Sequence, residues 1–411
     1  MQTITLAHKK TFYETIVLQL LSKMSKGRID IHLPSGELLQ FGDGTGSVHA
    51  SVNISDNRFF EKCVLYGDIG FGEAYTDGYW ETDNIAEVIK WFLLNVDSAP
   101  TLSGSRMKSG VINILKMMNR LKHSLRKNNL TMAKTNISEH YDLNNDFFKV
   151  FLDPTMTYSS AYFEQDEMEL ATAQIAKYEM LCESMKIKPG DHVLEIGSGW
   201  GGNAIHLAKN HHCKVTTVTI SEEQYKYTKE QIEKENLSEK VEVKLMDYRL
   251  INGQFDKIIS IEMLEAVGHE FFDVFFKKCQ DLLKPKGVLG FQVITCPDSR
   301  YDSLRKGVDW IQKHIFPGSL LPSVSALNSS INRTGEMTMM SLKEMGFHYA
   351  KTLRIWKQKF NENLDEVRKL GFDEKFIRKW NYYFSYCEAA FDMRNISVMQ
   401  MVYTRPNNTD F

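Results

Sequence analysis

The chain has 411 residues, 43% of them hydrophobic, which is long enough for about two or three domains with ordinary buried cores. Its 50 basic and 52 acidic side chains give a formal net charge of −2. That balance excludes the global positive field typical of nucleic-acid-binding proteins, so we predict no nucleic-acid partner, although a local basic patch stays open.

Cysteine usage and hydropathy define the compartment that we expect. Six cysteines are scattered without CxxC or Cys/His spacing, which argues against a zinc site and a disulfide framework. The first thirty residues carry charges inside their apolar pattern, unlike a signal peptide, and no run of about 18 apolar residues is present. The sequence therefore predicts a cytoplasmic protein without a metal.

Residues 1–100 are predicted to form a small α+β domain. Apolar residues at helical spacing over 17–24 are followed by an alternating segment at 29–33. The turn residues 34–36, Pro-Ser-Gly, then predict a hairpin.

Residues 101–135 form a basic link with eight Lys or Arg and no Asp or Glu. Apolar residues from Val111 to Leu125 recur at helical spacing, with the basic residues largely off that stripe. An amphipathic basic helix of this kind lies on an anionic membrane surface or packs between domains. The pattern leaves both readings open.

From residue 136 to 411 the pattern predicts an α/β domain with a mostly parallel sheet. The first four predicted strands are each followed by a helical or loop segment, the βαβ signature. Two late strands are separated by a long helical stretch. The predicted strands lie near 192–196, 214–219, 241–245, 256–261, 287–294, 349–356 and 396–403.

A glycine-rich turn after the first of these strands is the strongest motif. Gly197 and Gly199 follow an apolar strand and precede an amphipathic helix, so bare main chain can approach a ligand. Rossmann dinucleotide folds use the same device. Glu195, two residues before Gly197, suits the cationic amino-acid end of S-adenosylmethionine (SAM) and is poorly placed against a pyrophosphate. The alternative is a tight turn without a ligand.

The next two strand ends supply further candidate contacts to SAM. Thr219 and Gln224 stand where dinucleotide enzymes place an acidic residue for the ribose hydroxyls. Asp247, followed by Tyr248, could accept from the adenine amino group. Asp247 could equally be a turn residue at the end of its strand.

At these residues the sequence resembles a known family, the cyclopropane fatty acyl phospholipid synthases. The resemblance covers 136–406, and residues 1–100 resemble more weakly the N-terminal lipid-binding-like domain of longer bacterial members. The motifs that carry it are 140–148, 151–163, the glycine loop, 219–224, 247–249, 262–268 and 315–318.

The resemblance implies a class I methyltransferase fold with a seven-stranded sheet. Members transfer a methyl group from S-adenosyl-L-methionine to the cis double bond of an unsaturated phospholipid acyl chain. Loss of a proton then closes a cyclopropane, with bicarbonate assisting. Segments 298–345 and 357–395 would cap the site and shape an acyl tunnel. Alternatives are a C- or N-methyltransferase acting on another hydrophobic substrate, and a non-catalytic SAM- and lipid-binding protein.

The resemblance also assigns site residues. Tyr158 and Ser159 would cover the cofactor, and Glu265 falls on the carboxylate that holds bicarbonate. Tyr349, expected at the start of the sixth strand, matches a bicarbonate-contacting tyrosine. Two candidate catalytic positions depart from the best-known synthases, because Ser160 and Gln292 replace Cys and His.

Two further assignments have an alternative in plain packing. Cys387 matches a recurring cysteine that is either catalytic or packed within an aromatic helix. Aromatic faces could stabilise a cationic intermediate. The candidates for that role are Tyr162, Phe163, Trp310, Phe316, Tyr382 and Tyr383.

A substrate that stays in the bilayer favours the membrane reading of the basic link. We therefore expect peripheral association with an anionic membrane surface through 101–135. A homodimer is left open.

Overall fold

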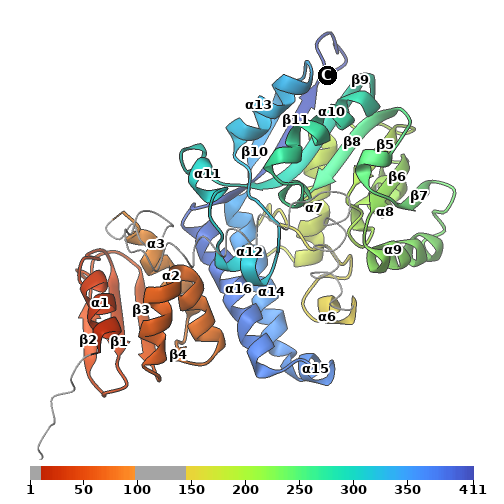
Figure 1. The fold of residues 1–411 in the computed structure, drawn as a ribbon. Helices are drawn as coiled ribbons and strands as arrows, with labels where there is room; N and C mark the ends of the chain where they lie inside the picture. The colour runs from red at the N-terminus through yellow and green to blue at the C-terminus, as the bar shows by residue number, and fades with distance from the viewer. Residues whose placement is uncertain (1–10, 98–144) are drawn as a thin grey trace, which may run out of the picture.

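The computed structural model describes residues 11–97 and 145–411, which build a four-stranded and a seven-stranded sheet (Figure 1). The strand orders are β2-β1-β3-β4 and β10-β11-β9-β8-β5-β6-β7. The basic link predicted at 101–135 lies outside the described residues. Within them, no helix combines the length and apolar composition that a bilayer span needs.

The smaller sheet and its helices are built as the N-terminal pattern predicted. Thr11 and Glu14 form a capping box that begins the first helix. The first two strands pair antiparallel across the turn at 34–36, which confirms the hairpin. The elements are α1 (Phe12–Leu21), β1 (Arg28–His32), β2 (Leu38–Phe41), β3 (His49–Ile54), α2 (Arg58–Thr76), β4 (Trp80–Glu81) and α3 (Ile85–Leu94).

The larger sheet confirms the class I methyltransferase fold. Five strands pair parallel with one another, and the last strand in the chain pairs antiparallel with both of its neighbours. The strands are β5 (His192–Ile196), β6 (Lys214–Thr219), β7 (Val241–Leu245), β8 (Phe255–Ile261), β9 (Leu283–Thr295), β10 (Thr338–Glu344) and β11 (Ser397–Thr404).

Helices cover this sheet and extend beyond its carboxyl edge. Those that alternate with the strands are α7 (Leu170–Ser184), α8 (Gly202–Asn210), α9 (Glu222–Lys234) and α10 (Phe272–Leu282). The others are α6 (Asn145–Lys149), α11 (Asp298–Leu304), α12 (Trp310–His314), α13 (Val324–Thr334), α14 (Gly346–Glu362), α15 (Leu364–Lys369) and α16 (Glu374–Asp392). The described part of the chain also contains three short 3₁₀ turns, η1 (Tyr248–Leu250), η2 (Leu264–Ala266) and η3 (His269–Phe271).

The strand predicted at 349–356 is wrong, because this segment belongs to α14. Tyr349, Leu353, Trp356 and Phe360 are spaced by four, three and four residues, so they form one buried helical face. The sixth strand in the chain order of this domain is β10, which lies inside the cap segment predicted at 298–345. The end of that segment therefore belongs to the sheet and not to a cap.

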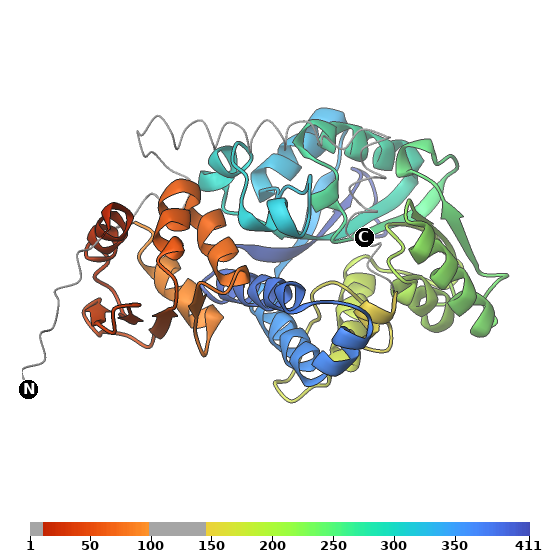
Figure 2. The same ribbon diagram turned by 60° about the horizontal axis from the view of Figure 1, so that its bottom comes forward.

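Helix α16 joins the two parts of the molecule, lying between α2 and α3 on one side and α14 on the other (Figures 1 and 2). Its Arg378 donates to the carbonyl oxygens of Tyr75 (2.7 Å) and Trp80 (3.1 Å) and pairs with Glu81 at 2.6 Å. Toward the larger domain, Trp380 contacts the ring of Phe147, with 4.7 Å between ring centroids. One apolar cluster thus continues from the N-terminal helices to the segment that leads into the site.

Candidate active site

The glycine loop after β5 presents bare main chain at the carboxyl edge of the sheet. Gly197, Gly199 and Gly201 have φ values of 98°, 49° and 91°, a left-handed conformation that glycine adopts without steric cost. A Cβ on Gly199 would meet no atom within 4 Å, whereas one on Gly197 would meet the side chain of Met263. The loop is therefore open above Gly199, where a ligand can approach the backbone.

Glu195 lies behind this loop with its carboxylate held by two side chains. It accepts from Asn203 Nδ2 at 2.8 Å and from Thr217 Oγ1 at 2.5 Å. Burial raises its pKa to about 7, against the effect of these bonds. Each carboxylate oxygen has a second lone pair, so a cationic ligand group could still be bound here.

The ends of β6 and β7 bring together the other residues predicted to contact the cofactor. Thr219 Oγ1 donates to Gln224 Oε1 at 2.9 Å, so these two side chains form one polar group. Asp247 caps η1 by accepting from the Arg249 amide, and it pairs with the Arg249 guanidinium at 2.6 Å. Asp247 therefore does act as a turn residue at the end of its strand. Tyr248 packs against Phe275, with 5.3 Å between ring centroids.

The segment 158–160 crosses the same edge, and each of its side chains or amides is anchored. The Tyr158 and Tyr383 hydroxyls are 2.9 Å apart. Lys177 donates from Nζ to Ser159 Oγ at 2.7 Å. The Ser160 amide donates to Glu262 Oε1 at 2.8 Å, while the Ser160 hydroxyl bonds a neighbouring carbonyl.

Glu262, which directly follows β8, is the centre of this arrangement and was not among the predicted site residues. Its Oε1 accepts from the Ser160 amide and, at 2.7 Å, from Gln292 Nε2. The Tyr349 hydroxyl also hydrogen-bonds this carboxylate. Gln292 is itself fixed by Gln400, which donates to its Oε1 at 3.0 Å. Three positions singled out by the sequence thus converge on a fourth that was missed.

The backbone of Glu262 is strained. Its φ is 49°, in the left-handed region that costs a residue with a side chain roughly 1–2 kcal/mol. Residues held in such conformations cluster at functional sites. The Glu262 side chain is only half-buried, so a substrate could reach it.

Glu265 occupies η2, just beyond β8, as the sequence predicted. Its Oε1 accepts from the Ile294 amide at 2.5 Å, and its buried Oε2 has no hydrogen-bond partner. Burial, together with the negative charge of Glu262, raises the pKa of Glu265 to about 8. Near neutral pH this carboxyl group therefore holds its proton to a large extent.

Tyr349 reaches the site from a helix and not from a strand. It lies in the first turn of α14, which follows β10, and its ring packs on Phe391 with centroids 4.6 Å apart. The expected neighbourhood is thus preserved although the predicted secondary structure was wrong.

The structure favours packing for Cys387 and places the aromatic candidates in different surroundings. Burial raises the pKa of the half-buried Cys387 thiol well above its usual range, which favours packing over a thiolate nucleophile. Trp310 and Tyr382 are buried against each other, with centroids 4.6 Å apart. Phe316 packs near Tyr158, at 6.4 Å between centroids, beside Tyr383. Tyr162 instead contacts Lys343.

Lys177 is the second functional candidate that sequence reasoning missed. It is fully buried in α7, and burial lowers its pKa to about 7 against the opposing charges of Glu262, Asp153 and Glu195. The sequence did offer a signal, because Lys177 stands among the buried positions of this helix and lysine is almost never fully buried unless it is paired.

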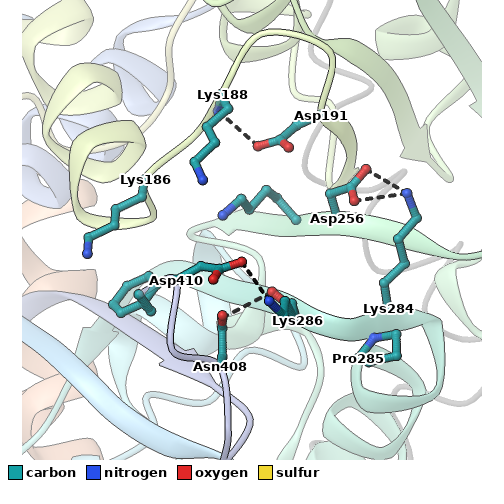
Figure 3. A pocket seen from close by; sticks show the side chains of 11 residues that line it. Lys186, Lys188, Asp191, Asp256, Lys284, Pro285, Lys286, Asn408 and Asp410 are labelled. Atoms are coloured by element: carbon teal, nitrogen blue, oxygen red, sulfur yellow. Dashed lines mark hydrogen bonds and ion pairs between the residues drawn. The ribbon is translucent and has the colours of Figure 1, made fainter.

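A cavity of about 340 Å³ lies at the opposite, amino edge of the sheet (Figure 3). Lys284 is directed at Asp256 and Lys286 at Asp410, with distances of 2.8 and 2.9 Å, and all four side chains are partly exposed. This cavity is far from the glycine loop along the strands and holds none of the predicted site residues.

One group of potential metal ligands occurs in the described residues. The ligand atoms of Cys182, His206 and His211 lie within 4.8 Å of one another, a proximity that their spacing in the sequence did not reveal. Glu179 pairs with both imidazoles at 2.9 Å, so these rings already have a partner. The absence of a metal stays a prediction.

Comparisons with known proteins agree with this geometry. Residues 128–401 match the family model described as mycolic acid cyclopropane synthetase. The chain is 36% identical over 394 residues to the tuberculostearic acid methyltransferase UfaA1 of Mycobacterium tuberculosis, covering 92% of this chain and 89% of that protein. It is 35% identical over 374 residues to the cyclopropane-fatty-acyl-phospholipid synthase of Escherichia coli, covering 88% and 89%.

A solved structure extends the similarity to a ligand-bound protein. The mycolic acid cyclopropane synthase CmaA1, complexed with SAH and CTAB, superposes with a TM-score of 0.61 at 30% identity. The match covers 66% of this chain and 98% of that one.

Proposed function

The chain belongs to the mycolic acid cyclopropane synthetase family of SAM-dependent methyltransferases, and from this premise we propose that it acts on unsaturated phospholipid acyl chains. In this proposal the methyl carbon of SAM is added to a cis double bond, and loss of a proton closes a cyclopropane ring. The observation that carries the proposal is the group of buried or half-buried carboxylates beside the open glycine loop.

The residues around the loop suit SAM, which supplies an electrophilic methyl group. Gly197 and Gly199 would give close backbone contact, and Glu195 would face the ammonium group. The adenosine end would meet the Thr219–Gln224 pair and the Asp247–Tyr248 turn. In this arrangement Tyr158 and Ser159 close the site from the other side.

An alkene is a weak nucleophile, so the protein must position it and keep water from the resulting cation. The wall next to Tyr158 is aromatic: Trp356 packs on it with centroids 5.2 Å apart, and Phe316 and Tyr383 adjoin it. Aromatic faces attract positive charge without reacting with it. This wall supports an acyl substrate over a polar one.

A methyl-branched product is the second candidate, because the similarity to the tuberculostearic acid methyltransferase covers nearly the whole chain. The two routes share methyl transfer and the loss of a proton from the transferred methyl group. Loss from the first cation closes a cyclopropane, whereas a 1,2-hydride shift before the loss gives a methylene branch. Saturation of the branch would further need a hydride donor.

Access to a substrate in a bilayer would come from the basic link. Its eight Lys or Arg side chains are each worth on the order of 1 kcal/mol near an anionic surface. We propose peripheral binding to anionic membranes through 101–135. Sedimentation with anionic vesicles should fall with added salt and should weaken when Lys116, Arg120, Arg126 and Lys127 are changed to Gln. Unchanged binding by that variant would favour packing between domains.

The experiment that tests the proposed function supplies the purified protein with SAM and vesicles of phosphatidylglycerol with monounsaturated chains. We expect SAH to form and the acyl mass to rise by one methylene unit. Vesicles with saturated chains are the matched control and should give no SAH above background. Equal SAH formation from both kinds of vesicle would refute an acyl double bond as the acceptor.

A further inference from the structure

The geometry points to Glu262 as the built-in proton acceptor of the reaction, occupying the place expected for bicarbonate. This inference rests on the proposed function only in needing a cationic intermediate that loses a proton. It assigns to a side chain of the protein the role that the family resemblance gives to a bound anion.

The donors that would hold a separate anion are already used. The Ser160 amide, Gln292 Nε2 and the Tyr349 hydroxyl all hydrogen-bond the Glu262 carboxylate. Two of these bonds, at 2.8 and 2.7 Å, converge on the single atom Oε1. A bicarbonate ion would have to displace this carboxylate and share the space with its negative charge. The residues present therefore do not fit bicarbonate.

The backbone conformation of Glu262 favours glycine over a residue with a side chain. Glu262 has a φ of 49°, and its amide is fixed by the Gln292 carbonyl oxygen at 2.8 Å. Glycine would adopt this φ without strain, so a glutamate at this position is better explained by a chemical role than by folding.

The surroundings of Glu262 and Glu265 indicate which of these two carboxyl groups accepts the proton. Burial raises the pKa of Glu262, but the donors Ser160, Gln292 and Tyr349 and the positive charge of Lys177 all oppose that rise. Burial and the like charge of Glu262 both raise the pKa of Glu265, whose Oε1 accepts from the Ile294 amide and whose Oε2 is unpartnered. Environments that differ in this way assign the base to Glu262 and leave the proton on Glu265. The remaining facing group, the Tyr349 phenol, stays neutral because burial raises its pKa.

The step balances without any further reagent. The alkene electron pair forms a bond to the methyl carbon of SAM, the sulfur–carbon bond breaks, and SAH leaves. The cation then gives one proton of the transferred methyl group to the Glu262 carboxylate, and the electrons of that C–H bond close the ring. When a 1,2-hydride shift first moves the positive charge to the carbon that carries the methyl group, the same electrons form the methylene double bond. Glu262 returns its proton to solvent before the next cycle.

A binding measurement tests the inference without any lipid. Calorimetric titration of the protein with sodium bicarbonate should show no saturable site in the wild type. Glu262→Gly removes the carboxylate and relieves the backbone, so this variant should gain a bicarbonate site. A wild-type site that is unchanged in Glu262→Gly would overturn the inference, as would the absence of any site in a variant that still folds and binds SAM.

Turnover tests the same inference in the catalytic step. In carbonate-free buffer the wild type should keep its full rate, whereas Glu262→Gln should lose about 10²–10⁴-fold with SAM affinity changed little. Bicarbonate should restore part of the rate to Glu262→Gly and none to Glu262→Gln, whose amide still fills the space. The isosteric control is Glu362→Gln at the exposed end of α14, which should match the wild type.

The outcomes separate this inference from the proposed function. A wild-type rate that falls on removal of bicarbonate, or a near-normal Glu262→Gln, would overturn Glu262 as the base while leaving the lipid substrate intact. Failure of the wild type on every unsaturated lipid would refute the proposed substrate, and the bicarbonate titrations would still decide the occupant of the anion position.

Discussion

The two edges of the seven-stranded sheet differ in how far their charged side chains are exposed to solvent. At the amino edge, Lys284 and Asp256 form a pair whose side chains are 44% and 29% exposed, next to the cavity of about 340 Å³. At the carboxyl edge, Glu195 and Lys177 are buried, and Glu262 is half-buried within a ring of donors. The cavity of about 340 Å³ and the stronger shifts in pKa are thus at different edges of the sheet.

This difference indicates which edge of the sheet holds the candidate active site. Exposed ion pairs contribute only about 0–1 kcal/mol and need little support from the fold. Buried ionisable groups with shifted pKa values are costly and are concentrated at functional sites. Lys257 is buried at the amino edge, but Glu195, Lys177 and Glu265 gather at the carboxyl edge, where parallel α/β sheets also bind their ligands.

The largest effect should come from closing the glycine loop. Gly199→Val puts a β-branched side chain at a φ of 49° and into the space above the backbone, so SAM binding should weaken about 100-fold or more. Gly371→Val is the matched control, since Gly371 also has a positive φ and no atom within 4 Å of a Cβ. Calorimetry should show normal SAM affinity in the control. Equal losses in both variants would mean that backbone strain alone explains the effect.

The second prediction compares one buried lysine from each edge. Lys177→Met removes the positive charge facing Glu262, so the pKa of that carboxylate should rise and the ascending limb of the pH–rate profile should move to higher pH. Lys257→Met removes a buried lysine at the amino edge, where Nζ donates to the Met185 carbonyl oxygen. We expect the limb to stay in place in Lys257→Met. A common shift in both variants would contradict the division between the edges.

The third prediction concerns stability. The pKa of Glu265 rises from 4.5 to about 8 on folding, so its stabilising contribution is fully present below pH 4.5 and is lost as the pH rises toward 8. Glu265→Gln cannot ionise, and its Tm relative to wild type should be higher at pH 8 than at pH 5 by a few degrees. A thermal scan at both pH values measures this difference. An identical offset at the two pH values would show that Glu265 does not titrate in this window.

The smallest effect is expected at the amino edge. Asp256→Asn removes the exposed pair with Lys284, so the free energy of unfolding should change by no more than about 1 kcal/mol. Turnover of SAM should stay within about twofold of wild type. A large loss of turnover at unchanged stability would mean that the cavity of Figure 3 takes part in the reaction, and it would contradict the assignment of the site to the carboxyl edge.

The sequence predicted most of the larger sheet because its strands are short apolar runs bounded by glycine or charged residues. It failed at 349–356, where Tyr, Thr, Leu, Ile and Trp favour a strand locally. Packing of this segment on α16 selects the helix instead.

The open loop at Gly197 and Gly199 and the Glu195 carboxylate behind it were similarly accessible from sequence, since these residues are adjacent in the chain. The proton acceptor that we infer was not. The bonds that single out Glu262 come from Ser160 and Gln292, 102 and 30 residues away, and its left-handed φ has no signature in the sequence. The motif around Glu262 therefore directed attention to Glu265.

Methyl transfer from SAM to an acyl double bond, followed by loss of one methyl proton, is tested most directly by labelling the methyl group. The protein is incubated with SAM that carries a trideuterated methyl group and with vesicles of monounsaturated phosphatidylglycerol, and the lipid is fragmented in a mass spectrometer. We predict that the label enters the acyl chain with two of its three deuterium atoms, because one hydrogen of the methyl group is lost as the proton. Label in the head group, or an unlabelled acyl chain despite SAH formation, would contradict the account.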